Sequence, residues 1–358
     1  MEEGGIGRAQ GSTPIPMKAQ IELQIGRKTF ASGLLPELIA ALRRGRAGDL
    51  VAVVGDDAGV GPELETWCRF TGNPLQEFTL ENSRPRWVFR CGAVSTPAED
   101  KRPVGSRLWL YTNFHCNLRC DYCCVRASPT VPSRELGLAR IRQIAREAAE
   151  LGVKEIFVTG GEPFLLDNIG EILLSCAAAA PTTVLTNGML FNGQRAETLR
   201  ALSRDRIVLQ ISLDSPTPKL HDLHRGPGTW ARAYAGIQFA RAHGFRVRLA
   251  ATVSNDAEAE EFRQFLDEAK IAAEDRVIRR IALRGSAADG LALSRADLIP
   301  EVTITADGVY WHPVGAEDAD LLVTRDIFPL AESFSAVRRA FDHEAEHANR
   351  LARIFNCA

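Results

Sequence analysis

The first hundred residues alternate between two periods of apolar spacing. From Ala19 onward apolar residues fall on every second position and then at helical spacing, which predicts a strand followed by a helix. The pair recurs once, and two further strand-like runs follow as a predicted hairpin. The predicted strands cover 21–25, 49–54, 75–80 and 86–91, and the predicted helices 34–42 and 62–70. The order β-α-β-α-β-β is typical of a small two-layer α/β domain.

Beyond this region the pattern becomes a regular alternation of strand and helix, with about 25–35 residues per unit. The predicted strands cover 107–112, 155–159, 182–186, 207–213, 246–253 and 276–283. The predicted helices between them cover 135–151, 168–179, 196–203, 230–242 and 258–269. Such alternation predicts a parallel sheet with helices outside it, in an open or closed barrel. In barrels of this kind the chemistry gathers at the carboxyl ends of the strands.

Shifts in composition divide the chain into five parts. Residues 1–16 contain Gly, Pro and Ser without an apolar period and predict a disordered leader. Residues 17–95 form the small domain, and 96–105 a polar linker marked by Pro and Gly. The strand–helix alternation occupies 106–285, and a C-terminal extension with a predicted helix over 341–353 occupies 286–358.

The composition excludes several classes of function. A hydrophobic content of 45% with 25% charged residues is ordinary for a soluble globular protein, and the net charge of −2 predicts no general attraction to nucleic acid or acidic membranes. No apolar run is long enough to cross a membrane, and the N-terminus lacks the layout of a signal peptide. The eight cysteines, half of them within 116–124, do not resemble a secreted disulfide framework. We expect a cytoplasmic protein.

The cysteine-rich stretch carries the strongest chemical signal. Cys116, Cys120 and Cys123 have the spacing C-x3-C-x2-C, which can fold round one corner of an inorganic cluster. A cubane iron–sulfur cluster normally takes four cysteines, so three would leave one iron open to a small chelating molecule. The spacing differs from the paired C-x2-C elements of a zinc site. The alternative is a chance group of packing thiols. Cys124 is expected to point away from the other three.

This stretch resembles the signature of the radical S-adenosylmethionine (radical SAM) enzymes, C-x3-C-x-aromatic-C, with Tyr122 in the aromatic position. The resemblance covers residues 106–285 and implies a partial (β/α)6 TIM-type barrel. It also implies one 4Fe-4S cluster on the three cysteines and S-adenosylmethionine as cosubstrate, with Tyr122 near the adenine. Cleavage of that cosubstrate to a 5′-deoxyadenosyl radical would require an electron donor such as flavodoxin or ferredoxin.

Two further motifs follow predicted strands. In the superfamily a Gly-Gly-Glu-Pro element receives the amino group of S-adenosylmethionine, and it corresponds here to Gly160, Gly161, Glu162 and Pro163. Glu162 would add a negative charge near the ammonium. The alternative is a simple turn between strand and helix. Asn187, within Thr-Asn-Gly at the end of the third strand, would line the floor of the cavity, although Asn-Gly is also a common turn.

The end of the fourth strand offers ligands for a nucleoside. Ser212 and Asp214 can both satisfy ribose hydroxyls. The following segment, KLHDLHRGPGTW, resembles the His-Asp-x-x-Arg-Gly element of the peptide-modifying radical SAM branch, in which Arg225 would pair with the methionine carboxylate. His221 and His224 have the spacing of metal ligands, but we expect them to be satisfied surface histidines.

The small domain, over residues 18–95, resembles the sulfur-carrier proteins related to TusA in its segment DLVAVVGDDAGVGPELETWCRFTGNPLQEF. That family carries its persulfide on a Cys-Pro-x-Pro element, and Gly33 stands here where the cysteine should be. Without a thiolate there is no nucleophile to hold sulfur. Cys68 is expected to pack in the second helix. We therefore expect a module that docks or presents a peptide or protein substrate.

The C-terminal extension resembles a SPASM extension that has lost its cysteines. The frame expects a cysteine just after Tyr310, where Trp311 and His312 stand, and only Cys357 remains near the end. These residues cannot supply an auxiliary cubane. We expect a degenerate extension in which His312 and Cys357 have no chemical role.

The substrate itself cannot be deduced from these residues. The branch resemblance favours a peptide or protein side chain, and the carrier-like domain also fits sulfur- or selenium-related small molecules. A cluster-bearing but catalytically silent scaffold is a further hypothesis. A zinc-binding adaptor is the last.

Overall fold

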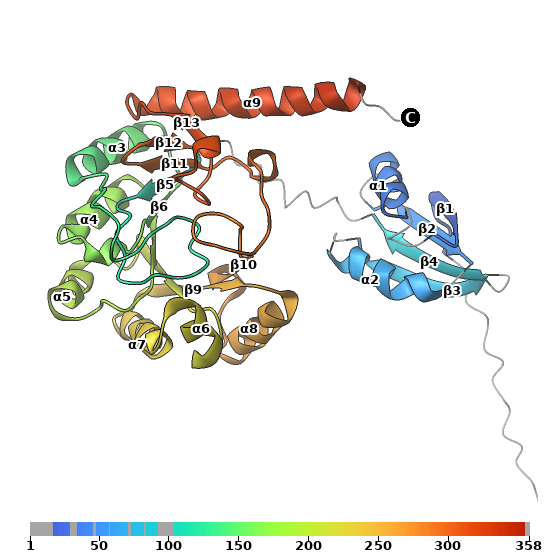
Figure 1. Ribbon diagram of the computed structural model, residues 1–358, viewed down its shortest axis with the longest axis horizontal. Helices are drawn as coiled ribbons and strands as arrows, with labels where there is room; N and C mark the ends of the chain where they lie inside the picture. Colours follow the sequence, from blue (N-terminus) through green and yellow to red (C-terminus); the bar gives the residue numbers. More distant parts are fainter. Residues whose placement is uncertain are drawn as a thin grey trace, which may run out of the picture. The chain divides into compact units, whose positions relative to one another are not determined.

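The computed structural model divides the chain into two compact units, Met1–Lys101 and Arg102–Ala358 (Figure 1). It describes residues 17–28, 34–45, 48–56, 58–70, 73–81, 84–91 and 104–354. The predicted leader, most of the predicted linker, Gly33 and Cys357 lie outside these residues. Each unit is described by itself.

The first unit is a four-stranded sheet with two helices. The elements are β1 (Ile21–Gly26), α1 (Leu34–Arg44), β2 (Leu50–Gly55), α2 (Gly61–Phe70), β3 (Leu75–Glu81) and β4 (Arg84–Arg90). The strand order is β1-β2-β4-β3, with β1 and β2 parallel and the other pairs antiparallel. Alternate strand residues such as Trp87 and Phe89 form one core with Leu38 and Leu64 of the helices, because burying apolar area favours the two-layer arrangement. The predicted β-α-β-α-β-β order is confirmed.

The second unit is built on a nine-stranded sheet in the order β10-β9-β8-β7-β6-β5-β11-β12-β13. Six of its described strands run parallel and lie side by side in chain order. They are β5 (Arg107–Tyr111), β6 (Glu155–Thr159), β7 (Thr182–Thr186), β8 (Ile207–Ser212), β9 (Arg246–Val253) and β10 (Arg276–Arg280). Among the described strands the sheet ends at β10 and β13, so it is open.

The helices of the second unit follow the strands and lie outside the sheet (Figure 1). They are α3 (Leu138–Glu150), α4 (Ile169–Ala179), α5 (Gly193–Ala201), α6 (Pro218–Arg225), α7 (Thr229–Ala242) and α8 (Asp256–Glu268). The predicted strand–helix alternation is confirmed as a mixed α/β fold with a parallel sheet. Helix α6 was not predicted; Pro218 begins it and Gly226 follows its last residue with φ 107°. This helix carries three of the candidate site residues.

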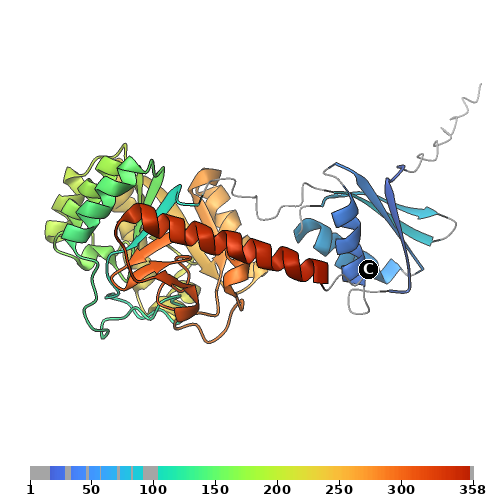
Figure 2. The ribbon, with the colours of Figure 1, turned by 90° about the horizontal axis from the view of Figure 1, so that it is seen from above.

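The C-terminal extension continues the main sheet. Strand β11 (Val302–Thr305) pairs parallel with β5 and forms a hairpin with β12 (Gly308–Tyr310), which pairs with β13 (Leu322–Thr324). Sequence analysis did not predict these strands. It also placed the start of the last helix too late, because α9 runs over Leu330–Ile354 (Figure 2). Pairing with β5 holds the extension beside the strand that leads into the cysteine loop.

Candidate active site

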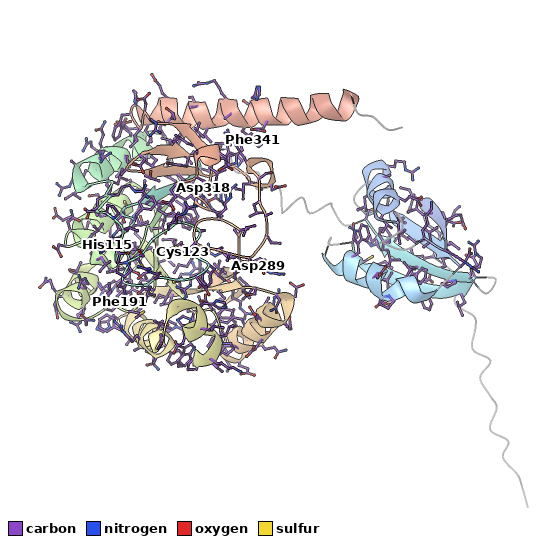
Figure 3. All side chains as sticks on the ribbon, viewed as in Figure 1. His115, Cys123, Phe191, Asp289, Asp318 and Phe341 are labelled. Carbon is purple, nitrogen blue, oxygen red and sulfur yellow. The ribbon has the colours of Figure 1, made fainter. Side chains whose placement is uncertain are left out.

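A cavity of about 200 Å³ lies at the carboxyl ends of the parallel strands. The cysteine loop after β5 forms one wall, and residues at the ends of β6, β7, β8, β9 and β10 form the others. Figure 3 shows the side chains of this unit and labels Cys123 near its centre. The predicted site residues that line the cavity are Cys116, Cys120, Tyr122, Cys123, Gly160, Gly161, Asn187, Ser212 and Arg225.

The cysteine loop is held by its backbone. The amide of Cys116 donates to the carbonyl of Ser128 (3.3 Å), and the amide of Cys123 donates to the carbonyl of Cys120 (3.3 Å). The thiol of Cys116 accepts from the amide of Leu118 (3.4 Å). These bonds curl the loop, so that three thiols separated in sequence lie along the same cavity.

The three thiols are protonated in the free protein. Burial raises the pKa of all three, to about 12 for Cys123, and the negative charge of neighbouring thiolates and carboxylates adds to the rise. The charge of Arg225 opposes this rise at Cys120. A metal ligand must be a thiolate, so cluster binding here would release protons.

Two glycines let the end of β6 approach the cysteine loop. A Cβ at Gly161 would lie 2.0 Å from the carbonyl oxygen of His115, and one at Gly160 would lie 2.5 Å from that of Asn113. Gly160 also has φ +149°. Glycine is therefore needed at both positions for a reason separate from any ligand. That reason is the packing of two backbone segments.

Glu162 does not line the cavity. Its side chain is fully buried and accepts hydrogen bonds from the amides of Phe164 (3.0 Å) and Asn187 (2.8 Å) and from the hydroxyl of Thr186 (2.8 Å). Burial raises the pKa of this carboxyl, although these hydrogen bonds oppose the rise. The carboxylate thus ties the end of β6 to the end of β7, and its place near a ligand's ammonium stays a prediction.

Pro163 is buried and begins a short 3-10 helix, also away from the cavity. Asn187 does line the cavity. Its side-chain amide donates to the oxygen of Asn117 (2.8 Å) in the cysteine loop, and its own oxygen accepts from the amide of Met189 (3.0 Å). The Asn-Gly turn and the cavity-lining role, posed as alternatives, coexist in this residue.

Asp214 is the centre of a buried polar network. The Arg225 guanidinium donates to both of its carboxylate oxygens, at 2.6 and 3.1 Å, and the Tyr122 hydroxyl donates to one of them. Burial alone would raise the pKa of Asp214, but the positive charge of Arg225 and these hydrogen bonds lower it overall. Asp214 is 1% exposed and lies behind Ser212 and Arg225, which themselves line the cavity. Its described partners are protein groups, and its contact with a ribose stays a prediction.

The two histidines of α6 have separate partners. His221 is 1% exposed and its Nδ1 accepts from the amide of Asp214 (3.1 Å), so its prediction as a surface histidine was wrong. Burial and the charge of Arg225 lower the pKa of His221 to about 4. His224 contacts the exposed carboxylate of Asp121 (2.9 Å). Among the described residues, neither histidine belongs to a group of three His, Cys, Asp or Glu side chains that could hold a metal ion.

The part of the chain that forms most of this cavity is similar to a known family. Residues 110–269 match the model of the Radical SAM superfamily. The chain carries a radical SAM domain. The match begins in β5 and ends just after α8, so the TusA-like and SPASM-like resemblances remain predictions from sequence.

Curated relatives of the radical SAM domain have different names. The antilisterial bacteriocin subtilosin biosynthesis protein AlbA of Bacillus subtilis is 33% identical over 165 residues, which are 45% of this chain and 36% of AlbA. The probable GTP 3′,8-cyclase of Archaeoglobus fulgidus is 33% identical over 45% of this chain and 55% of its own length. The chain thus spans about a third to a half of the length of these relatives. A solved structure of anSMEcpe with bound AdoMet has a TM-score of 0.51 at 14% identity, covering 65% of this chain and 77% of that chain, which supports the fold alone.

The residues of the radical SAM domain fit the groups that the superfamily uses, a 4Fe-4S cluster and S-adenosylmethionine. Three thiols line one cavity, where their charges influence one another. Among the described residues, no three His, Cys, Asp or Glu side chains, these thiols included, lie close enough together to hold a single metal ion. A cubane has a different requirement, because each cysteine binds a different iron at a different corner.

The C-terminal extension forms a further wall of the cavity of the radical SAM domain. Pro313 and Val314 line it, and the Tyr111 hydroxyl donates to the carbonyl of Pro313 (2.7 Å). Gly285, with φ +63°, packs so closely that a Cβ there would lie 2.4 Å from the carbonyl oxygen of Cys123. His312 is uncharged, since burial and nearby arginines lower its pKa to about 4. Its Nδ1 accepts from the amide of Val314 (3.1 Å), which agrees with a packing role.

Sequence analysis missed several residues of this cavity, among them Cys124, Arg279 and Arg280. Cys124 lines the same cavity as the three motif cysteines, contrary to the expectation that it points away. Arg279 lines it from β10. The register of the two strands, which only the structure gives, explains this position: Arg279 is level with Thr252 of β9, and residues at matched positions in parallel strands face the same side.

Proposed function

We propose that this chain is a radical SAM enzyme that reductively cleaves S-adenosylmethionine and abstracts hydrogen from a substrate. The observation that carries the proposal is the gathering of Cys116, Cys120 and Cys123 on one cavity with Gly160 and Gly161 at the carboxyl ends of parallel strands. When bound, the 4Fe-4S cluster supplies the electron that divides S-adenosylmethionine into methionine and a 5′-deoxyadenosyl radical.

The three thiols would hold one cluster, since the only cysteine of the C-terminal extension is Cys357. Their partial burial would limit the access of water to a bound cluster. Pro313 and Val314 of the C-terminal extension would add to this protection, because they line the same cavity. The protein thus contributes orientation and exclusion of water, while the cofactors supply the reactivity.

The nucleoside and amino-acid parts of S-adenosylmethionine would be held by the residues of β8 and α6. Ser212 offers a hydroxyl in the cavity. Arg225 would receive the carboxylate through the N–H groups of Nη1, because Asp214 already occupies Nε and Nη2. Asp214 keeps Arg225 and Tyr122 in place, and the guanidinium lies 5.5 Å from the centre of the Tyr122 ring. The tyrosine therefore presents a fixed aromatic wall beside the cysteine loop.

Gly160, Gly161 and Asn187 would receive the amino group through backbone and side-chain oxygens, because they line the cavity. Glu162 would act one layer behind them: by bonding both the Asn187 amide and the Thr186 hydroxyl it fixes the distance between β6 and β7. Pro163 directs the chain away from the cavity into a buried turn.

We propose a peptide or protein side chain as the substrate, presented by the first unit. The name of AlbA as a bacteriocin biosynthesis protein supports this class. The first unit supports it through β3, which lies at the edge of its sheet and exposes Phe78 (52%) and Leu80 (67%). An edge strand can receive an extended peptide through main-chain hydrogen bonds. An electron donor such as flavodoxin or ferredoxin and a cytoplasmic location complete the proposal. The described residues hold no helix long and apolar enough to cross a membrane.

The test is an anaerobic reconstitution followed by counts of iron and sulfide. Dithionite and S-adenosylmethionine are then added and 5′-deoxyadenosine is measured. Cys120→Ala removes one motif thiol, and Cys124→Ala is the matched control for iron content, because Cys124 lines the same cavity outside the motif. We expect about four irons per chain in the unaltered protein and in Cys124→Ala, and a labile or absent cluster in Cys120→Ala.

Formation of 5′-deoxyadenosine by the unaltered protein, lost in Cys120→Ala, would support the enzyme. A protein that binds the cluster and S-adenosylmethionine but never cleaves it, even with candidate peptides, would support the silent scaffold instead. A colourless protein that retains zinc would contradict both proposals in favour of an adaptor.

A further inference from the structure

Arg279 occupies a defined place on the cavity wall. It lies one residue before the end of β10 and is level with Thr252 of β9, which also lines the cavity. Side chains at matched positions in parallel strands project from the same face of the sheet. The register therefore directs this guanidinium toward the side of the sheet that holds the cysteine loop.

The other arginines around the cavity already have carboxylate partners. Arg225 binds Asp214 through two hydrogen bonds, and Arg280 binds Asp256 (2.9 Å). Arg284 binds Asp318 and Asp320, each at 2.9 Å. Within the part of the chain that the structure describes, Arg279 has no carboxylate within ion-pair distance. It is thus a cavity-lining cation whose charge no described acid neutralises.

The groups around Arg279 cannot neutralise it. Burial raises the pKa of Tyr111, so the phenol stays neutral even though the charge of Arg279 opposes that rise. Burial and the charges of Arg284 and Arg279 lower the pKa of His312 to about 4, so the imidazole stays uncharged. The rest of this wall is largely apolar, with Val125, Ala282 and Val314. One uncompensated guanidinium on a neutral wall is the kind of polar group that fixes a ligand's orientation.

We propose that Arg279 binds an oxyanion, a carboxylate or a phosphate, carried by the substrate. This inference rests on the proposed function, which puts a substrate in the cavity. The planar guanidinium matches the two oxygens of such a group, and a partly desolvated site strengthens the pair relative to water. S-adenosylmethionine is not the expected source of the anion, because Asp214 takes only Nε and Nη2 of Arg225, which leaves the N–H groups of Nη1 on the cavity wall for the methionine carboxylate in the proposed function.

The experiment uses the full chain with its cluster, under anaerobic conditions. Binding of radiolabelled inorganic phosphate and of acetate is measured by equilibrium dialysis at constant ionic strength, because exposed charges are screened by salt. Arg279→Gln removes the charge and Arg279→Lys keeps it. Arg280→Gln is the matched control: its arginine neighbours Arg279 on the same strand and lines the cavity, but is already paired with Asp256. Each titration is repeated with saturating S-adenosylmethionine.

We expect one of the two anions to bind, with Kd raised at least tenfold in Arg279→Gln and less than threefold in Arg280→Gln and Arg279→Lys. The preferred anion distinguishes a phosphorylated substrate from a carboxylate one. Binding should persist with S-adenosylmethionine present. No binding of either anion, or equal losses in the Arg279→Gln and Arg280→Gln variants, would overturn the proposal.

Displacement of the anion by S-adenosylmethionine, together with weakened S-adenosylmethionine binding in Arg279→Gln, would also overturn it, because Arg279 would then serve the cosubstrate. Formation of 5′-deoxyadenosine is measured on the same samples after dithionite and candidate peptides have been added. Anion binding without any 5′-deoxyadenosine would show that the proposed function fails while the anion site stands. Cleavage without anion binding would show the reverse.

Discussion

The segments after β6 and β8 each hold one buried carboxylate, and the pKa values of the two are shifted in opposite directions. Glu162 is bonded only by neutral donors, two amides and a hydroxyl. Asp214 is bonded by a guanidinium and a phenol. Burial penalises the charged form of both. At Glu162 burial prevails and the pKa rises, whereas at Asp214 the charge of Arg225 prevails and the pKa falls.

Both acidic motif residues thus form their hydrogen bonds with groups of the protein itself. Each carboxylate joins two strand ends or a strand and a helix, and the residues it holds are the ones that line the cavity. The difference between their pKa shifts comes from their partners and not from a difference in exposure, since both are almost fully buried. Substitutions at the two positions should therefore differ in size and in pH dependence.

The largest expected effect follows from Asp214→Asn. It leaves the guanidinium of Arg225 buried without a countercharge, which typically destabilises by about 3–5 kcal/mol. Hydrogen exchange of the amides in β8 and β9, measured by mass spectrometry, should show this loss. The control is Asp121→Asn, whose exposed carboxylate pairs with His224, and an exposed pair contributes at most about 1 kcal/mol. Equal losses in both variants would contradict the central role of Asp214.

A smaller effect is expected for Glu162→Gln. Glutamine has nearly the same shape but keeps only one acceptor oxygen, so at least one of the three donors that meet Glu162 loses its partner. A buried donor without a partner costs about 1–3 kcal/mol. The same exchange measurement on β6 and β7 tests this, with the exposed Glu171→Gln as control. No change would mean that neutral Glu162 already supplies the bonds as a protonated acid.

The third prediction concerns the direction of the pH dependence, where one unit of pKa shift corresponds to about 1.4 kcal/mol. The pKa of Glu162 is raised on folding, so its contribution to stability is present at low pH and is lost as the pH rises through its folded pKa. The pKa of Asp214 is lowered, so its contribution is present above about pH 4 and is lost as the pH falls through its folded pKa.

The unaltered protein should therefore exceed Glu162→Gln most at low pH, and should exceed Asp214→Asn most at neutral pH. Exchange rates corrected for their intrinsic pH dependence, measured on the β6 and β8 peptides of the three proteins, give both differences. Differences that change with pH in the same direction would contradict the contrast between the two carboxylates.

The smallest expected effect is that of Thr186→Val. Its hydroxyl donates to Glu162 (2.8 Å) and accepts from the amide of Gly188 (3.0 Å), and a net hydrogen bond contributes about 1 kcal/mol. Exchange of the β7 amides should increase modestly. Thr198→Val, whose half-buried hydroxyl donates to the carbonyl of Gln194 within α5, should leave exchange of the β7 amides unchanged. An effect as large as that of Glu162→Gln would show that the hydroxyl, and not the carboxylate, holds the two strand ends together.

Much of the architecture was predictable because local periodicity survives folding. The strands over Glu155–Thr159 and Thr182–Thr186 were predicted residue for residue, since parallel strands buried on both faces are continuous apolar runs between turns. The strands of the C-terminal extension were missed. Val302–Thr305 is only four residues long, and its status as a strand depends on pairing with β5, almost two hundred residues earlier in the chain.

The sequence by itself determined the kind of chemistry, through C-x3-C-x2-C and the glycine, serine and arginine motifs at strand ends, because residue type and spacing specify which ligands a loop can offer. Tertiary structure alone decided which motif residues face the cavity. Glu162 and Asp214 have the composition of ligand-binding groups, yet they are directed into the protein because donors from other elements meet them there. Arg279 stays exposed to the cavity because, among the described residues, no acid from a neighbouring element reaches it. Such pairings depend on contacts between elements that are distant in the chain, and no local pattern records them.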